Sequence, residues 1–137
     1  MTKHTYIGSF IYHILAKNSF GFFATHLDLE ACIIPIDDRI KNNGYAHTAI
    51  LAKALKSKGL KPRYNTLWAR NEVHYAGKSL QYRLSHPRGL EYRGPWGDIL
   101  IVDDIVTTGL TLKEAYYAAK TKGASPLAAL VLADRRN

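Results

Sequence analysis

The feature of this sequence that most restricts its fold is an apolar run that ends in two adjacent aspartates. Residues 99–102 are four consecutive aliphatic residues, typical of a strand buried on both faces of a parallel sheet. Asp103 and Asp104 follow, residues 111–122 have helical spacing, and residues 127–132 form a second apolar run. A strand, a loop, a helix and a strand in this order predict a right-handed crossover in an α/β sheet.

The rest of the chain extends this alternation. Apolar spacing predicts a helix over 7–16, a strand over 31–36, a helix over 46–58 and a strand over 63–69. Residues 70–96 are polar, basic and interrupted by Gly and Pro, so we expect mostly loop there, forming a flexible hood. We therefore predict one α/β domain over 1–137, with a central, mostly parallel sheet flanked by helices.

Composition is consistent with one ordinary globular domain. The 137 residues are 47% hydrophobic, enough to bury a core without disulfides or metal. The single cysteine, Cys32, stands in an apolar run, and nothing indicates an oxidising compartment. No apolar stretch approaches the roughly 20 residues that cross a bilayer, and residues 1–6 lack a signal-peptide pattern. We expect a cytoplasmic protein that is not transmembrane.

Positive charge is concentrated in one segment. The chain has a formal net charge of +8, which favours anionic partners. Residues 56–93 contain nine Lys or Arg against two Glu, a net of +7. This segment therefore includes nearly all of the excess charge.

The aspartate pair and the turn after it predict a sugar-phosphate site. Adjacent carboxylates at the end of a buried strand repel each other, so a ribose diol or a hydrated Mg²⁺ is the kind of partner that suits them. Residues 107–111 then open a helix with hydroxyls and free backbone N–H groups, which suit a phosphate, and Gly109 lets the backbone come close. This spacing fits ribose 5-phosphate.

Residues 99–111 resemble the 5-phosphoribosyl-1-pyrophosphate (PRPP) signature of type I phosphoribosyltransferases. The resemblance implies that Asp103 and Asp104 reach the ribose hydroxyls, directly or through Mg²⁺ and water. It implies a 5-phosphate site formed by Thr107, Thr108, Gly109, Leu110 and Thr111. The alternative is that the aspartates merely end a strand and the turn is an ordinary helix N-cap.

Two further parts of the site follow from the same resemblance. Asp37, Asp38 and Arg39, after the strand over 31–36, correspond to the pyrophosphate loop; the alternative is a surface turn with scattered charges. The hood over 70–96 corresponds to the family's mobile flap, which closes over the leaving pyrophosphate. The candidate flap cations are Arg70, Lys78 and Arg83, and a solvated basic loop is the alternative.

The order of the motifs looks most like ComF-type competence proteins, over about 125 residues. That branch implies a role in natural transformation, in which imported single-stranded DNA passes the uptake machinery at the inner membrane. Its usual four-cysteine zinc module is missing, and the six histidines show no metal spacing, so we expect Mg²⁺ and no zinc. Thr107 stands where purine-salvage members usually have an Asp, which leaves base activation unassigned.

Two functions remain open at this stage. The first is Mg²⁺-dependent phosphoribosyl transfer to a nitrogen nucleophile, which includes a nucleobase phosphoribosyltransferase of nucleotide salvage. The second is a PRPP-responsive or structural module of DNA uptake, or a non-catalytic single-stranded DNA-binding module. For the second, aromatic residues interleave with cations in the basic segment: Tyr64, Trp68, Tyr75, Tyr82 and Tyr92. Core packing of these aromatic rings is the alternative, and the sequence determines neither the acceptor nor the oligomeric state.

Overall fold

A computed structural model of the chain describes residues 29–36, 47–71, 77–106 and 108–135. The helix expected over 7–16 lies outside these residues. The central sheet has four strands, all parallel, in the order β2-β1-β5-β6. Its strands are β1 (Ala31–Pro35), β2 (Leu60–Pro62), β5 (Gly97–Val106) and β6 (Ala124–Asp134).

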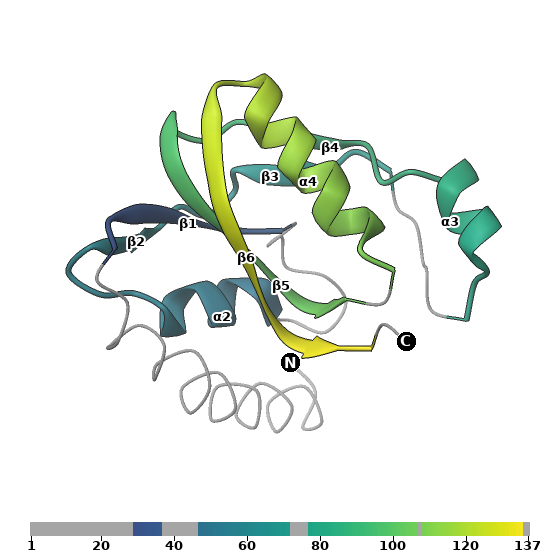
Figure 1. Cartoon of the computed structure of the whole chain (residues 1–137), viewed down its shortest axis with the longest axis horizontal. Helices are drawn as coiled ribbons and strands as arrows, with labels where there is room; N and C mark the ends of the chain where they lie inside the picture. Colours follow the sequence, from purple (N-terminus) through teal and green to yellow (C-terminus); the bar gives the residue numbers. More distant parts are fainter. Residues whose placement is uncertain (1–28, 37–46, 72–76, 107, 136–137) are drawn as a thin grey trace, which may run out of the picture.

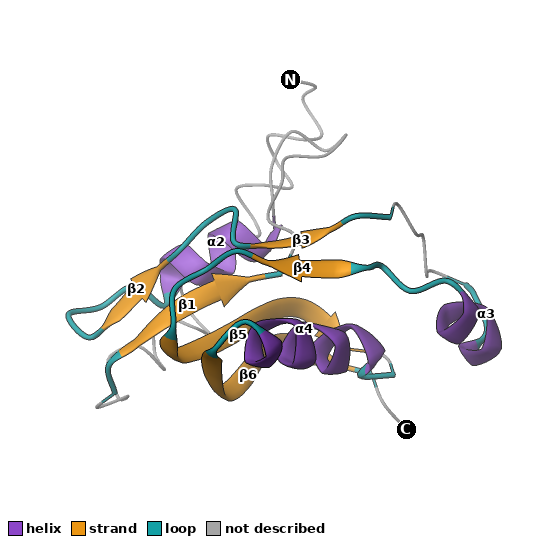
Figure 2. Ribbon diagram, turned by 90° about the horizontal axis from the view of Figure 1, so that it is seen from above, coloured by secondary structure: helices purple, strands orange, loops and turns teal. Residues whose placement is uncertain are grey.

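Helices cover both faces of this sheet (Figure 1). Helix α2 (His47–Ala54) lies on one face and α4 (Leu110–Thr121) on the other. A two-stranded antiparallel ribbon, β3 (Leu67–Ala69) with β4 (Leu90–Tyr92), packs beside α4, and the short helix α3 (Leu80–Ser85) precedes β4 (Figure 2). The predicted α/β fold with a parallel, helix-flanked sheet is confirmed.

The two faces of the sheet bury separate apolar clusters. Under α2, Leu51 and Leu55 pack with Ile33, Leu100 and Val102, all nearly inaccessible to solvent. Burial of each such side chain stabilises the fold by about 1.5–3 kcal/mol. On the other face, small and bulky residues pack together between α4, the sheet and the ribbon, among them Ala115, Ala119, Ile99, Ile101, Leu67 and Tyr92.

Small residues explain why α4 and the ribbon lie so close together. Ala115 and Ala119 are one helical turn apart and fully buried, and they leave room for the Tyr92 ring. The hydroxyl of Tyr92 donates a hydrogen bond to the Pro95 carbonyl at 2.6 Å. Burial raises the pKa of Tyr92 to about 12. Tyr92 is therefore a core residue that fastens the ribbon to the sheet.

Several element boundaries differ from those expected. The strands predicted over 31–36 and 99–102 and the helix over 111–122 are confirmed as β1, β5 and α4, and the helix predicted over 46–58 is the shorter α2. The strand of the main sheet that follows α2 is β2. Within the strand predicted over 63–69, only β3 is extended, and it pairs with β4 outside the main sheet. The expected loop over 70–96 contains α3 and β4. We keep the name hood for residues 70–96.

No helix within the described ranges has the length and apolar character that crossing a bilayer requires.

Candidate functional site

The topology brings the candidate site to one edge of the sheet. Because all four strands are parallel, their carboxyl ends lie at the same edge, where ligands of α/β sheets usually bind. Helices α2 and α4 both begin there, so both direct the positive ends of their dipoles toward this edge. Helix α3 of the hood projects beyond the same edge in both ribbon views (Figures 1 and 2).

Asp103 and Asp104 lie at this edge, but inside the strand rather than after it. Strand β5 continues to Val106, because β6 pairs with it that far. Side chains alternate along a strand, so the two side chains leave β5 on opposite sides, although their carboxyl groups lie close enough to hydrogen-bond each other. Val102 packs under α2 and Ile101 under α4, which places Asp104 on the α2 side and Asp103 on the side of α4 and the hood.

On the α2 side, Asp104 meets the first residue of the helix. Its Oδ2 lies 3.5 Å from Nδ1 of His47, and both side chains are about one-third exposed. The Oδ1 of Asp104 accepts a hydrogen bond from the backbone N–H of Ile105 at 2.7 Å. The Asp104 carboxylate is thus oriented, and part of it is open to a ligand.

On the hood side, Asp103 is the more buried of the two. Burial, followed by the negative charge of Asp104, raises the pKa of Asp103 to about 7, while the charge of Arg88 from the hood acts in the opposite direction. Its Oδ1 accepts a hydrogen bond from the Asp104 backbone N–H at 2.8 Å. The site therefore contains a carboxyl group that gives up its proton near neutral pH and that a cation would favour in its charged form.

The turn after β5 has the backbone shape of an anion site. Gly109 is the N-cap of α4, with a φ of 81°, and it has no side chain that could cap the helix. The hydroxyl of Thr108 accepts only a long hydrogen bond, 3.4 Å, from the Leu110 N–H. The first-turn N–H groups of α4 are therefore available to a phosphate. Of the five residues predicted for the 5-phosphate, Thr107 lies outside the described residues, and the other four form this turn.

The aspartate pair offers carboxylate oxygens, which are ligands that Mg²⁺ prefers. Within the described ranges, no three His, Cys, Asp or Glu side chains gather as a ready metal site. Mg²⁺ commonly uses one or two carboxylates and completes its shell with waters and substrate phosphates. Asp103 and Asp104 match that requirement.

The remaining predicted residues lie in different surroundings. Asp37, Asp38 and Arg39 fall outside the described residues. The candidate flap cations are all in the hood: Arg70 is ion-paired with Glu91 at 2.8 Å, Lys78 lies 5.0 Å from the centre of the Tyr82 ring, and the Arg83 Nε donates to the Lys78 carbonyl at 3.2 Å. Lys78 therefore lies just before α3 and Arg83 within it, beyond the carboxyl edge.

The aromatic residues proposed for nucleic acid divide into three groups. Tyr92 is only 3% exposed, so its interpretation as a stacking residue is wrong for this structure. Trp68 is half-buried under the Arg93 guanidinium, 4.7 Å from its ring, and Tyr82 stacks on His86 at 3.9 Å. Tyr64 is 45% exposed, and Tyr75 lies outside the described residues.

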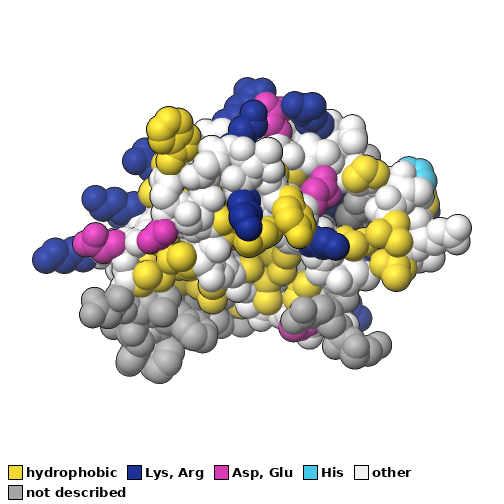
Figure 3. Space-filling view, turned by 45° about the horizontal axis from the view of Figure 1, so that its top comes forward, with side chains coloured by type: hydrophobic (Ala, Val, Ile, Leu, Met, Phe, Trp, Pro, Cys, Tyr) yellow, Lys and Arg dark blue, Asp and Glu magenta, His cyan; other side chains and the backbone are white. Residues whose placement is uncertain are grey.

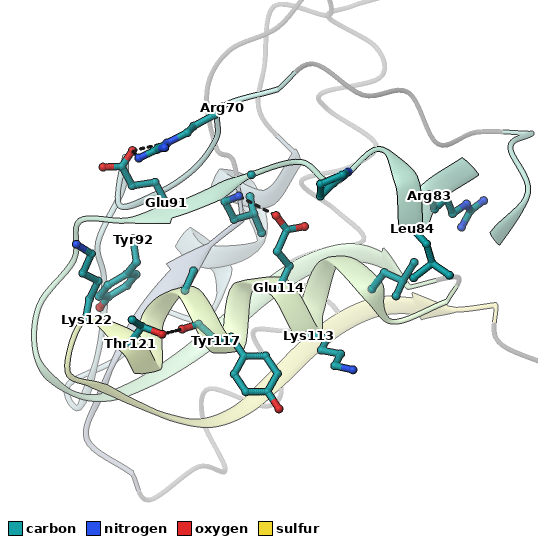
Figure 4. Close-up of a pocket in the computed structure, with 15 residues that line it drawn as sticks. Arg70, Arg83, Leu84, Glu91, Tyr92, Lys113, Glu114, Tyr117, Thr121 and Lys122 are labelled. Atoms are coloured by element: carbon teal, nitrogen blue, oxygen red, sulfur yellow. Dashed lines mark hydrogen bonds and ion pairs between the residues drawn. The ribbon is translucent and has the colours of Figure 1, made fainter. Parts of the chain in front are cut away.

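A groove of about 710 Å³ runs between α4 and the hood (Figure 4). Leu84, Leu90 and Tyr117 provide apolar walls, and Lys and Arg side chains border hydrophobic ones on this face (Figure 3). Glu114 connects the two sides, because its Oε1 accepts a hydrogen bond from the Leu90 N–H at 2.9 Å. Leu110 lies at one end, but neither aspartate of the pair lines the groove, so it borders the candidate site without containing it.

Two residues of the site were missed by sequence reasoning. His47 contacts Asp104, and Arg88 lies close enough to influence Asp103. His47 is the first residue of the helix that follows the strand over 31–36, and that strand was expected to end at the same edge of the sheet. This place in the sequence could have identified His47 as a site residue. Arg88 was counted only as one cation of the basic segment, and its approach to the sheet depends on the fold of the hood.

Solved structures share this fold. The chain has the fold of the type I phosphoribosyltransferases. A solved structure from a study of an invariant aspartic acid in HPRTs, a glutamic acid mutant, matches 92% of this chain and 78% of its own, with a TM-score of 0.51 and 19% identity. An orotate phosphoribosyltransferase from Aeropyrum pernix matches 90% of this chain and 56% of its own, with a TM-score of 0.45 and 22% identity.

Sequence comparison is less extensive. No protein-family model matches the chain. The transcriptional regulator GfcR of Halorubrum lacusprofundi is 44% identical over 39 residues, which are 28% of this chain and 18% of that protein. The match thus spans less than a fifth of that regulator.

Proposed function

We propose that the chain is a PRPP-binding protein of the phosphoribosyltransferase type, with its site at the carboxyl edge of the sheet. One observation carries the proposal: the carboxylate pair of β5 is followed directly by the uncapped start of α4. Acceptors for a ribose diol and donors for a phosphate are thereby a few residues apart along the chain.

Each part of the site has a role in this proposal. Asp104 lies beside His47 and accepts hydrogen bonds from the ribose hydroxyls. Asp103 is the second carboxyl group of the pair and lies on the hood side. Backbone N–H groups from Thr108 to Thr111 hold the 5-phosphate. Asp103 and Asp104 would hold Mg²⁺ through waters, and the ion would neutralise the pyrophosphate, which Asp37, Asp38 and Arg39 are proposed to hold. The hood, with Arg70, Lys78 and Arg83, excludes water when it closes.

Calorimetric titration with PRPP, with and without Mg²⁺, tests this site. We expect replacement of both Asp103 and Asp104 by Asn to weaken PRPP binding at least about 100-fold, because hydrogen bonds to charged groups contribute about 1.5–3 kcal/mol each. Asp98→Asn, an exposed carboxylate at the other end of β5, is the matched control and should leave the affinity unchanged. Equal affinity in the double variant and the control would refute the site.

A regulatory use of the site is the second candidate function. The short stretch of 44% identity with a protein described as a transcriptional regulator favours a PRPP-responsive module over an enzyme. Incubation with labelled PRPP and a panel of nucleobases separates the two functions. Release of pyrophosphate that depends on a base indicates a transferase, and PRPP binding without release indicates a sensor.

For the branch of the superfamily we propose the ComF type, from the order of the motifs, with a role in the uptake of single-stranded DNA. A salvage phosphoribosyltransferase is the competing branch. Tyr64 and Tyr82 are the remaining described aromatic candidates for contact with DNA. If single-stranded DNA binds the basic hood, its affinity should fall steeply as salt rises from about 50 to 200 mM. A flat salt response would exclude this role.

A further inference from the structure

The outer strand of the sheet has an edge that no described strand covers. Strand β6 is the last in the order β2-β1-β5-β6, and its eleven residues pair only with β5 among the described strands. Leu127 is 48% exposed, and Ala128 and Ala129 are also exposed. An uncovered edge presents backbone N–H and C=O groups that readily pair with another chain.

This edge lacks the features that usually prevent pairing. Proteins protect edge strands with charged side chains, proline or bulges. Pro126 and an irregularity in pairing at Leu127 interrupt the first part of β6. Residues 128–133, Ala-Ala-Leu-Val-Leu-Ala, contain no charge, no proline and no break. Half of the edge is therefore an open, uncharged strand.

Charge indicates which partner fits. The chain has a net charge of +8, so two copies repel each other over most of their surface. Residues 123–133 carry no charge, so here two copies can approach without this repulsion. An antiparallel pair centred on Val131 places Asp134 opposite the partner's Ala128, so no like charges meet within the pair.

We propose that two copies of the chain associate through β6, pairing antiparallel about a two-fold axis at Val131, which lies opposite its own copy. The two four-stranded sheets then form one continuous sheet. Because the strands of the two copies run in opposite directions, the carboxyl edges face away from each other and both candidate PRPP sites stay open. The association is therefore independent of PRPP binding, and its test does not depend on the proposed function.

Sedimentation of the full chain over a range of concentrations tests the association. We expect a concentration-dependent species of twice the 15.4 kDa chain mass. Ala129→Lys should weaken it at least about tenfold, because both copies carry the added charge into the pair. Gln81→Lys adds the same charge on exposed α3 and should leave association unchanged. Equal melting temperatures of the two variants establish that both are folded.

Cross-linking then tests the direction of pairing. In this antiparallel pair, Val131→Cys lies directly opposite its symmetry mate, whereas two copies of Ser125→Cys are separated by roughly 40 Å. A short bis-maleimide should join the first variant and not the second, with the unmodified chain controlling for Cys32. Cross-linking of both variants would mean parallel pairing. That result, a monomer at every concentration, or a dimer insensitive to Ala129→Lys would overturn the proposal.

Discussion

The Asp103→Asn substitution should stabilise the protein while removing its proposed activity. Burial and the neighbouring Asp104 raise the pKa of Asp103 from 3.8 to about 7, so the folded protein disfavours the charged form. A carboxyl group whose pKa is higher in the folded than in the unfolded protein contributes stability that is fully present below its unfolded-state pKa. This contribution is lost as pH rises through its folded-state pKa. Stability should therefore decline between about pH 4 and pH 7.

The size of the effect follows from the shift. A change from 3.8 to about 7 corresponds to about 4 kcal/mol of unfolding free energy above pH 7. Asn retains an Oδ1 that can accept from the Asp104 N–H, but its amide must also be desolvated, so we expect a net gain of about 1–3 kcal/mol. For a chain of this length, that raises the melting temperature by on the order of 5 °C.

Thermal unfolding at pH 5 and pH 8 measures this effect. Asp103→Asn should exceed the unsubstituted chain at pH 8 by more than it does at pH 5, and its affinity for PRPP with Mg²⁺ should fall. Asp98→Asn, in the exposed start of the same strand, should show no such pH dependence. An Asp103→Asn variant that is no more stable than the parent at pH 8 would refute the electrostatic argument.

Substitutions at four other positions test the structure around the pair. Gly109→Ala and Gly97→Ala both place a side chain at positive φ with nothing near the new Cβ. Each should therefore lower the free energy of unfolding by about 1 kcal/mol. Only Gly109→Ala should also weaken PRPP binding. Glu114→Ala should speed amide exchange at Leu90, which loses its acceptor, whereas Glu114→Gln should not. Tyr92→Phe should cost about 1 kcal/mol in denaturant unfolding, and tyrosinate absorbance from Tyr92 should be absent below about pH 11.

Local patterns predicted the fold better than they predicted the edges of its elements. The apolar runs of β1 and β5 and the helical spacing of α4 are contained in a few consecutive residues, and these elements are confirmed. The placement of the aspartates after the strand was wrong because β6 pairs as far as Val106, and the length of a partner strand is not a local property. The same holds for the β3–β4 ribbon, whose pairing spans the hood.

The residues of the candidate site divide in the same way, into those within one continuous segment and those that only the fold brings together. The acidic pair and the Gly109 turn belong to one continuous segment, so the sequence alone could indicate them. The alternation of a strand sets the sides from which the Asp103 and Asp104 side chains leave β5. The contact of His47 with Asp104 arises only when α2 and β5 meet at the carboxyl edge. Such pairs depend on topology, which a motif does not contain.

The unusual pKa of Asp103 also predicts that ligand binding releases a proton. A cation bound at the pair favours the charged carboxylate and lowers its pKa. With a pKa of about 7, about half of the unliganded molecules carry the proton on Asp103 at pH 7. Binding of PRPP with Mg²⁺ should therefore release about 0.5 proton per site at pH 7. The number of protons released should approach zero by pH 9. Calorimetry in buffers of different ionisation enthalpy measures this number directly, with the Asp103→Asn variant as the control that should release none from this group. Release that does not change between pH 7 and pH 9 would show that Asp103 is already charged before the ligand arrives, or that the ligand does not reach it.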